Sequence, residues 1–533
     1  MSAFSRLMAS AALGAAVLAA GLPAAMAETP PNMLVIANRI DDITSLDPAE
    51  SFEFSGADVI RNMYLKLVNL DPMDMSAGYQ PEIAESWDVS EDGRTVTFNI
   101  RSGLSFASGN PVTADDVVYS LRRAVLLNKT PSFILTQFGF TAENVEETIT
   151  GADGTVSITT DKPYAISFVL NCLTATIGAI VDSKLVMEHE ADGDMGNTWL
   201  KTNSAGGGAY TLAAWQPNEN VTLNANPGFY KGEPAMKRVI VRHVQESASQ
   251  RLMLERGDID VARNLNPEDI AGISGEEGIR IDEELGGQLM YLSFNQDNPE
   301  LAKPEVREAM KYLIDYAGMA DSFLKGQWAV QQNFLPLTFL GAVDENPFSL
   351  DIEKAKALLA EAGVPEGFTI EAGVREAQER IEIAQSFQNA LAQVGIKLDI
   401  TVGTAAQILG RYRARDLDVY VGTWGPDYPD PHTNASTFAW NPDNSVEAGA
   451  TGILAWRNAW DPGALTAQVD AAVIENDTEK RVEMYHEIQA EFRDTSPFAI
   501  LFQQARQTAV RDNVENLNLG DAISSAAYWP VTK

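Results

Sequence analysis

The sequence has a single cysteine, Cys172, among its 533 residues. One cysteine cannot form an intrachain disulfide, and it excludes metal sites built from several cysteines. We interpret Cys172 as a small core residue, because it lies in an apolar run. Basic residues are also scarce: 39 Lys and Arg stand against 74 Asp and Glu, which gives a formal net charge of −35. A chain this acidic repels phosphate backbones, so we expect no nucleic-acid partner.

Signatures of common enzymes are missing as well. The sequence contains no Gly-x-Ser-x-Gly elbow, no His-Glu-x-x-His pair and no phosphate-binding glycine loop. Asp427, Asp430 and His432 lie close enough in sequence to hold a metal in principle, but Pro429 and Pro431 between them favour an ordered loop. We therefore expect no catalytic residues, no metal site and no cofactor.

Long apolar runs are few, and one of them begins the chain. Arg6 is followed by an Ala-rich apolar stretch at 7–20, and Ala25-Met26-Ala27 precedes Glu28. A basic start, an apolar core and a small-x-small site are typical of a secretory signal peptide. The apolar core is too short to span a membrane comfortably. We expect residues 1–27 to be a signal peptide cleaved after Ala27, with export most simply to a bacterial periplasm.

A second stretch, from Pro163 to Val181, carries no charge over 19 residues. Asn171, Ser167 and several Thr and Pro residues interrupt its apolar character. We interpret it as a buried strand running into a helix rather than as a membrane span.

The first half of the chain is rich in predicted strands. Alternating apolar residues bounded by turn residues predict strands at 33–37, 87–89, 95–100, 210–212, 221–223 and 239–244. Helical spacing of apolar residues predicts helices at 113–124, capped by Thr113, and at 247–255.

From about Leu289 the pattern changes to an alternation of strands and helices. A strand is expected at 290–294, followed by a helix that starts at Pro304 and carries apolar residues on one face as far as Ala317. Further along, helices at 351–362, 376–394 and 405–414 alternate with strands at 368–374, 396–402 and 417–422. This βαβαβ order predicts an α/β fold with a largely parallel sheet.

Two of these strands end in distinctive residues. Arg375 directly follows one, and Trp424 and Asp427 follow another. If the strands are parallel, Arg375 and Asp427 emerge at the same edge of the sheet, where ligands bind in open α/β folds. A guanidinium and a carboxylate facing one cleft suit a zwitterionic ligand. One alternative is that Arg375 and Asp427 only form polar contacts with neighbouring protein residues. For Trp424, the alternative is that its side chain packs in the core.

Several short segments, spread over nearly the whole chain, carry a resemblance to a known family. They are Leu46-Asp47-Pro48, Ala84-Glu85-Ser86-Trp87, Asp92-Gly93-Arg94-Thr95-Val96-Thr97-Phe98, Gly109-Asn110-Pro111-Val112-Thr113-Ala114-Asp115-Asp116-Val117, Asn226-Pro227-Gly228-Phe229-Tyr230, Tyr291-Leu292-Ser293-Phe294-Asn295, Val306-Arg307-Glu308-Ala309 and Ala355-Lys356-Ala357-Leu358-Leu359-Ala360-Glu361-Ala362-Gly363. With these segments in this order, the chain resembles the bacterial extracellular solute-binding proteins of family 5, the dipeptide- and oligopeptide-binding components of ABC importers.

The resemblance implies a periplasmic-binding-protein-like fold of two lobes with an inserted extra domain. Lobe 1 would comprise residues 28–70, 190–285 and 505–533, the inserted domain 71–189, and lobe 2 residues 290–500. The chain would cross between the lobes near 289–294 and 500–504, and these crossings would form the hinge.

The resemblance also implies roles for single residues. In peptide-binding relatives, an aspartate three residues after a tryptophan takes the free amino group of the peptide, a pattern that falls on Trp424 and Asp427. Arg375 matches an arginine that takes the carboxylate in dipeptide-type relatives. Some oligopeptide-type relatives carry an arginine where this chain has Val421. With Tyr428, which adjoins Asp427, these residues form the predicted ligand-binding set.

Together these features predict a monomeric periplasmic receptor, not an enzyme, that captures short, dipeptide-like peptides for a membrane permease. One alternative is the same scaffold with a different cargo: a metal chelate, an opine, an oligosaccharide or an amine. A secreted hydrolase would be a second alternative, and a structural or chaperone-like export factor a third.

Overall fold

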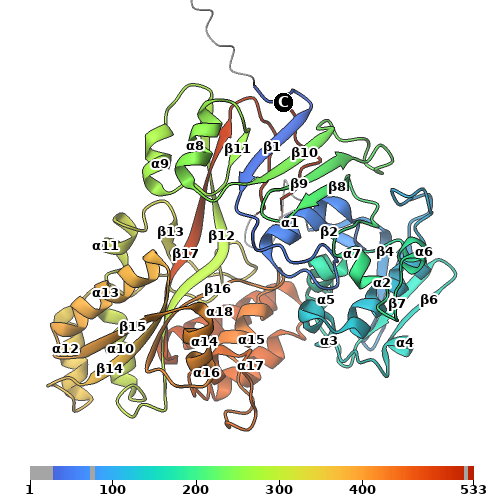
Figure 1. The fold of residues 1–533 in the computed structure, drawn as a ribbon. Coiled ribbons are helices and arrows are strands. Elements are labelled where there is room, and N and C mark those ends of the chain that lie inside the picture. Colours follow the sequence, from blue (N-terminus) through green and yellow to red (C-terminus); the bar gives the residue numbers. More distant parts are fainter. Residues whose placement is uncertain (1–27, 72–77, 521–525) are drawn as a thin grey trace, which may run out of the picture.

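A computed structural model describes residues 28–71, 78–520 and 526–533 of the chain (Figure 1). The predicted signal peptide at 1–27 lies outside these residues. We keep the names lobe 1, inserted domain and lobe 2 for the three sets of residue ranges that the resemblance implies. Within the described residues, no helix is both long and apolar enough to cross a membrane.

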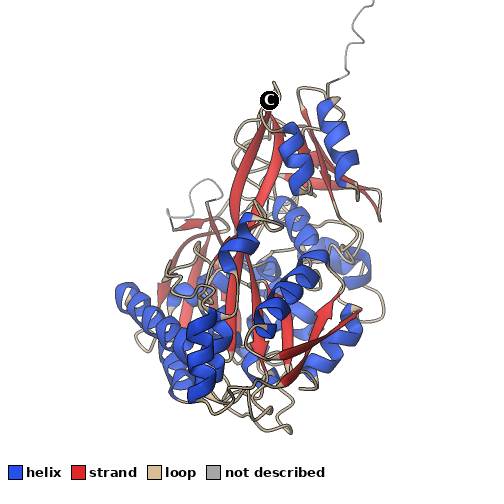
Figure 2. Ribbon diagram, turned by 90° about the vertical axis from the view of Figure 1, so that its left-hand side faces the viewer, coloured by secondary structure: helices blue, strands red, loops and turns tan. Residues whose placement is uncertain are grey.

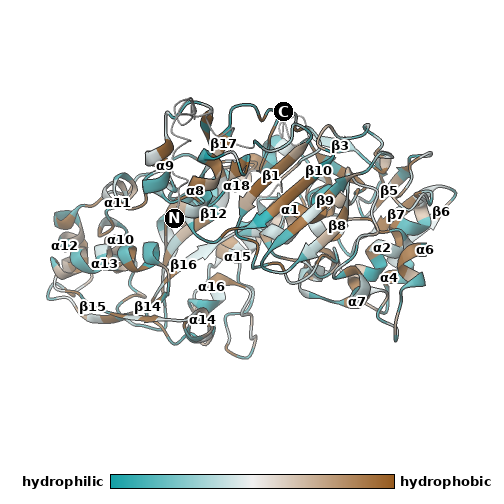
Figure 3. Cartoon of the chain, turned by 45° about the horizontal axis from the view of Figure 1, so that its top comes forward, coloured by the Kyte–Doolittle hydropathy of each residue, from teal (hydrophilic) through white to brown (hydrophobic). Residues whose placement is uncertain are grey.

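One large mixed sheet runs through both lobes. Its lobe 2 end is formed, in order, by β15 (Lys397–Gly403), β14 (Thr369–Arg375), β16 (Val419–Trp424), β12 (Ile279–Phe294) and β17 (Phe498–Arg511). The order continues into lobe 1 with β11 (Val261–Ala262), β1 (Met33–Asn38), β10 (Arg238–His243), β9 (Asn220–Ala225) and β8 (Tyr210–Gln216), and β13 (Trp328–Val330) pairs with β17. The strands β1, which is mainly hydrophobic, and β10 lie side by side in parallel (Figure 3).

The two long strands β12 and β17 connect the lobes. They pair antiparallel over almost their whole length, with a register irregularity between Leu285 and Leu289 (Figure 2). The predicted crossings at 289–294 and 500–504 fall within these strands, and hinge motion at them stays a prediction.

The inserted domain has its own small antiparallel sheet. Its strands are β4 (Ala84–Val89), β5 (Thr95–Ile100), β7 (Thr155–Thr159) and β6 (Ile149–Ala152), and β3 (Tyr79–Pro81) pairs with β2 (Val68–Leu70) of lobe 1. The strands predicted at 87–89 and 95–100 are confirmed; they pair as a hairpin, with Gly93 at φ +70° in its turn. The helices of this domain are α2 (Ala114–Leu127), α3 (Phe133–Thr136), α4 (Val145–Thr148), α5 (Ile166–Thr174) and α6 (Ser183–Glu188).

The remaining helices belong to the lobes. Those of lobe 1 are α1 (Phe54–Met63), α7 (Asn197–Leu200), α8 (Ser247–Glu255) and α9 (Pro267–Ile273). Those of lobe 2 are α10 (Pro304–Tyr312), α11 (Tyr316–Asp321), α12 (Ile352–Glu361), α13 (Gln378–Ala392), α14 (Ala405–Arg413), α15 (His432–Phe438), α16 (Leu454–Arg457), α17 (Ala464–Ala472) and α18 (Thr478–Thr495).

Three local predictions are wrong. The helix from Pro304 does not continue to Ala317: α10 ends at Tyr312, and α11 begins at Tyr316, where the Asp315 carboxylate accepts the backbone N–H of Gly318. The expected strand in the uncharged 163–181 stretch is absent from the described structure, which forms α5 and a short 3₁₀ turn there. The strand expected at 290–294 begins eleven residues earlier, at Ile279, because it continues across both lobes.

The largest hydrophobic cluster is shared between regions. It joins lobe 1 to the inserted domain, and Tyr428 and Val473 of lobe 2 also belong to it. In lobe 2, the two faces of the sheet pack separately: Val419 and Val421 face one cluster and Tyr420 faces the other.

A buried ion pair fastens the inserted domain to lobe 1. Arg123 of α2 donates two hydrogen bonds to the Asp47 carboxylate, at 2.8 and 2.6 Å. The side chains are 2% and 0% exposed, and Asn197 donates a further bond to Asp47 at 2.7 Å. Because both charges are out of water, removing one leaves the other uncompensated.

We predict that Asp47→Asn lowers the free energy of unfolding by about 3–5 kcal/mol, the usual cost of breaking a buried ion pair. Glu353→Gln is the control, since it removes an exposed pair with Lys356 and should cost less than about 1 kcal/mol. Urea denaturation of both variants measures the difference, and equal losses would contradict the prediction.

Candidate ligand-binding site

The ends of two strands of lobe 2 meet at one edge of the sheet. β14 pairs in parallel with both β15 and β16, and Val374 lies opposite Val421. The predicted parallel arrangement is thus confirmed for β14, β15 and β16, although β12 pairs antiparallel with β16 and with β17. Arg375 and the segment after Trp424 leave the sheet at the same edge.

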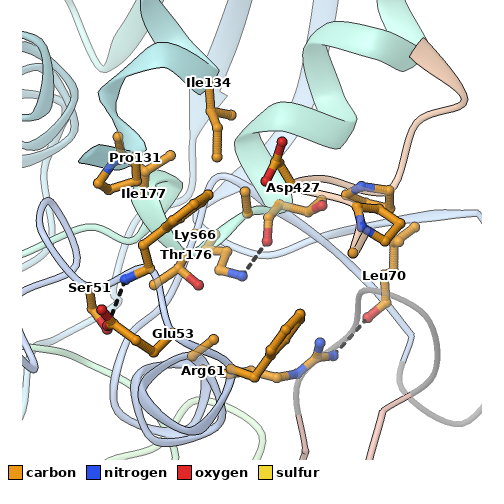
Figure 4. A pocket seen from close by; sticks show the side chains of 18 of the residues that line it. Ser51, Glu53, Arg61, Lys66, Leu70, Pro131, Ile134, Thr176, Ile177 and Asp427 are labelled. Carbon is orange, nitrogen blue, oxygen red and sulfur yellow. Dashed lines mark hydrogen bonds between the residues drawn. The ribbon is translucent and has the colours of Figure 1, made fainter. Parts of the chain in front are cut away.

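A cavity of about 230 Å³ lies beyond this edge, and all three regions of the chain line it (Figure 4). Lobe 1 contributes 51–54, Ala57, Arg61, Lys66, Asn69 and Leu70; the inserted domain contributes Pro131, Ile134 and 174–177; and lobe 2 contributes 425–427 and Pro429. A cavity with walls from both lobes can be closed around a ligand by bringing the lobes together.

Asp427 is the predicted site residue that lines this cavity. Its backbone N–H donates to the Thr433 hydroxyl at 3.1 Å, which holds the loop. Its carboxylate makes no hydrogen bond or ion pair with any described residue. Burial raises the pKa of the Asp427 carboxyl from 3.8 to about 7. The site therefore presents an acidic group that has no counter-charge among the described residues.

The loop that carries Asp427 approaches lobe 1 closely. A Cβ at Gly425 would lie 3.1 Å from the ring of Phe54, the first residue of α1. The loop that carries Asp427 therefore lies in close contact with the lobe 1 wall at Gly425.

Trp424 lies at the end of β16, outside the lining of this cavity. Its half-buried ring packs edge-on against Phe438, with ring centroids 6.4 Å apart. Its indole N–H is buried without a hydrogen-bond partner in the described structure. Trp424 thus combines core packing with one unused donor.

Arg375 ends β14 and also lies outside the lining of the cavity. Its Nε is buried without a partner among the described residues, and it makes no ion pair with Asp427. The neighbouring Arg380 donates to the Thr423 hydroxyl at 2.8 Å. Burial and the charge of Arg375 lower the pKa of Arg380. The structure therefore brings two arginines together, but does not show Arg375 facing Asp427 across the cavity.

Tyr428 is 3% exposed and faces the inserted domain. Its hydroxyl donates to the Gln137 side chain at 3.3 Å, and its ring packs 5.7 Å from that of Phe168. These contacts fix the position of the loop that presents Asp427.

Asp430 belongs to a buried polar network that the sequence did not reveal. Arg481 of α18 donates to its carboxylate at 2.7 and 2.9 Å, and the side chains are 1% and 0% exposed. Asn171 of α5 donates to Asp430 at 3.1 Å, and Arg481 also donates to Ser167 at 3.0 Å. This network joins the inserted domain to lobe 2 beside the cavity, so Asp430 is a docking residue rather than a second acid of the site.

Sequence reasoning also missed the charged residues that lobe 1 contributes, including Glu53, Arg61 and Lys66. For Lys66 a signal was present, because it interrupts the apolar run Tyr64-Leu65-Lys66-Leu67-Val68. Arg481 lies in α18, a helix with many charged residues, and no sequence pattern indicates that it pairs with Asp430.

Comparison with known proteins gives the family. The sequence model described as "Bacterial extracellular solute-binding proteins, family 5 Middle" matches residues 78–445, more than half of the chain. The probable D,D-dipeptide-binding periplasmic protein DdpA of Escherichia coli K12 is 28% identical over 506 residues, which cover 94% of each chain.

Two solved structures show the same fold. HbpA2 from Haemophilus parasuis is 24% identical, with a TM-score of 0.80 over 94% of this chain and 99% of that one. DppA from Helicobacter pylori in complex with the peptide STSA is 23% identical, with a TM-score of 0.77 over 94% of this chain and 98% of that one. The predicted fold class is confirmed. The chain belongs to family 5 of the bacterial extracellular solute-binding proteins, which are the non-catalytic solute receptors of ABC importers.

Proposed function

We propose that this receptor captures short, dipeptide-like peptides in the periplasm and delivers them to its membrane permease. The observation that carries the proposal is the carboxylate of Asp427, which faces a cavity between the lobes and has no partner among the described residues. The ammonium group of a peptide N-terminus would supply the missing charge through a charge-assisted hydrogen bond. Closure of the lobes excludes water and strengthens this contact.

The size of the cavity supports a compact ligand. Small-molecule sites commonly measure about 300–1,000 Å³, and this cavity holds about 230 Å³. An extended dipeptide spans at most about 7 Å of chain. Relatives are named for D,D-dipeptides, dipeptides, glutathione and heme, and the volume favours the smaller of these.

The other predicted residues keep their roles within this proposal. Trp424 would offer an apolar wall and its unused N–H. The resemblance gives the peptide carboxylate to Arg375, which lies outside the lining of the cavity, so its holder is a separate question. Tyr428 stays a predicted ligand contact, although its observed contacts are with the inserted domain.

The first test is the affinity of Asp427→Asn for alanyl dipeptides. We expect the wild-type protein to bind L-Ala-L-Ala or D-Ala-D-Ala, and the variant to lose about 2–5 kcal/mol of binding free energy, because one partner of a buried charged pair is gone. Titration calorimetry measures both, with the exposed Asp512→Asn as the matched control. Unchanged affinity in Asp427→Asn would remove Asp427 from the site, and failure of both dipeptides to bind wild type would overturn the peptide assignment.

The second test concerns the stability of the ligand-free protein. Because the folded state raises the pKa of Asp427 from 3.8 to about 7, the protonated carboxyl favours folding. This contribution is fully present below pH 3.8 and is lost as the pH rises through 7. We therefore expect Asp427→Asn to have a higher Tm than wild type at about pH 8, and the difference to shrink toward about pH 4. A difference in Tm that does not change with pH over this range would contradict the assignment.

The third test concerns export. We expect the protein in the periplasmic fraction of a Gram-negative host to begin at Glu28, because the small-x-small site ends at Ala27. N-terminal sequencing of that fraction decides the point, and exported protein that retains Met1 would refute the cleavage.

A further inference from the structure

Lys66 is a buried cation in the wall of the same cavity. It lies between α1 and β2, next to Leu65, which forms a β-bridge with Ile180. The residue is 4% exposed, and its ammonium group borders the cavity (Figure 4). That group donates to the carbonyl oxygen of Thr174, at the end of α5. An ammonium group has three N–H donors, so two of them have no partner in the described structure.

The ammonium group of Lys66 has no carboxylate in direct contact. Within the described residues it makes no ion pair. The buried Glu82 accepts the backbone N–H of Lys66 at 2.7 Å rather than its ammonium. Burial and the charge of Arg61 lower the pKa of Lys66 to about 7, while Glu82 acts in the opposite direction. Glu82 therefore offsets only part of the cost of burying this ammonium, and an anionic group in the cavity would offset more of it.

Two charged groups without a direct ion pair, Lys66 and Asp427, line one cavity but come from different lobes. Lys66 belongs to lobe 1 and Asp427 to lobe 2, and no ion pair joins them. The wall also includes Phe52, Phe54 and Ile134, which provide apolar surface. A ligand with one charge of each sign could satisfy both groups and would favour the arrangement in which the lobes are close together.

We infer that Lys66 binds the anionic group of the ligand and that the ligand is a compact zwitterion held between Lys66 and Asp427. This inference rests on the proposed function and deepens it. It assigns the carboxylate of the peptide to lobe 1, whereas the resemblance implies Arg375 of lobe 2. Each lobe would then hold one end of the cargo, so a molecule that lacks either charge would bind weakly.

The test compares a free carboxylate with a blocked one. Titration calorimetry measures the affinity of each protein for two ligands. One is the alanyl dipeptide, L or D, that wild type binds, and the other is the C-terminal amide of the same dipeptide. The proteins are wild type, Lys66→Met, Lys66→Arg and Arg375→Gln. We expect wild type to bind the free acid about 10- to 100-fold more tightly than the amide, since a hydrogen bond to a charged group has that value. Lys66→Met should lose this preference, while Lys66→Arg and Arg375→Gln should keep it.

The outcomes separate the inference from the proposal that it deepens. If wild type and Lys66→Met prefer the free acid equally, or if wild type shows no preference, Lys66 does not hold the carboxylate and the inference is overturned. Loss of the preference in Arg375→Gln alone would assign that role to Arg375. Failure of both dipeptides to bind wild type overturns the proposed function itself. Lys66→Gln, which keeps an N–H donor for Thr174, replaces Lys66→Met if that variant does not fold, and the same expectations apply to it.

Discussion

A carboxylate without a counter-charge, held where two lobes meet, is the feature around which the rest of the site is organised. Asp427 is enclosed enough for its pKa to rise to about 7, yet no described group neutralises it. Burial of a charge in a folded protein is normally accompanied by a partner. A surface that leaves one unmatched is therefore suited to a ligand that brings the partner with it, and such a ligand stabilises the closed arrangement by its differential contacts.

Two other buried carboxylates, unlike that of Asp427, form ion pairs. Arg123 pairs with Asp47 to attach the inserted domain to lobe 1, and Arg481 pairs with Asp430 beside the cavity. Asn171 joins the second pair from the inserted domain. These carboxylates are hydrogen-bonded as well as paired, and they position the walls of the cavity. Asp427 lies three residues before Asp430 but lines the cavity without a partner. A shift of three positions in one loop therefore separates a paired carboxylate from an unpaired one.

Much of the secondary structure was predictable from local patterns. Capping and spacing predicted α2 with Thr113 and α12 with Asp351, and alternation predicted the hairpin that turns at Gly93. The break after Tyr312 was not predictable from spacing, because apolar residues keep a helical period through it while Asp315 starts a new helix. The extent of β12 was missed for a different reason: its first half pairs with β17 across the lobes, and a pairing between residues more than 200 positions apart leaves no local pattern.

Periodicity and short motifs were sufficient to predict the fold class and the family, because both depend on patterns among neighbouring residues. Only the tertiary structure shows which charged side chains line the cavity. Asp427 lines the cavity, whereas Arg375 lies outside its lining. The register of the strands and the path of the loops after them determine the position of each side chain. Lys66, some 360 positions earlier in the chain, reaches the same cavity. Spacing along a chain cannot reveal such a contact, because the distance between two side chains in a folded protein depends on the packing of all the elements between them.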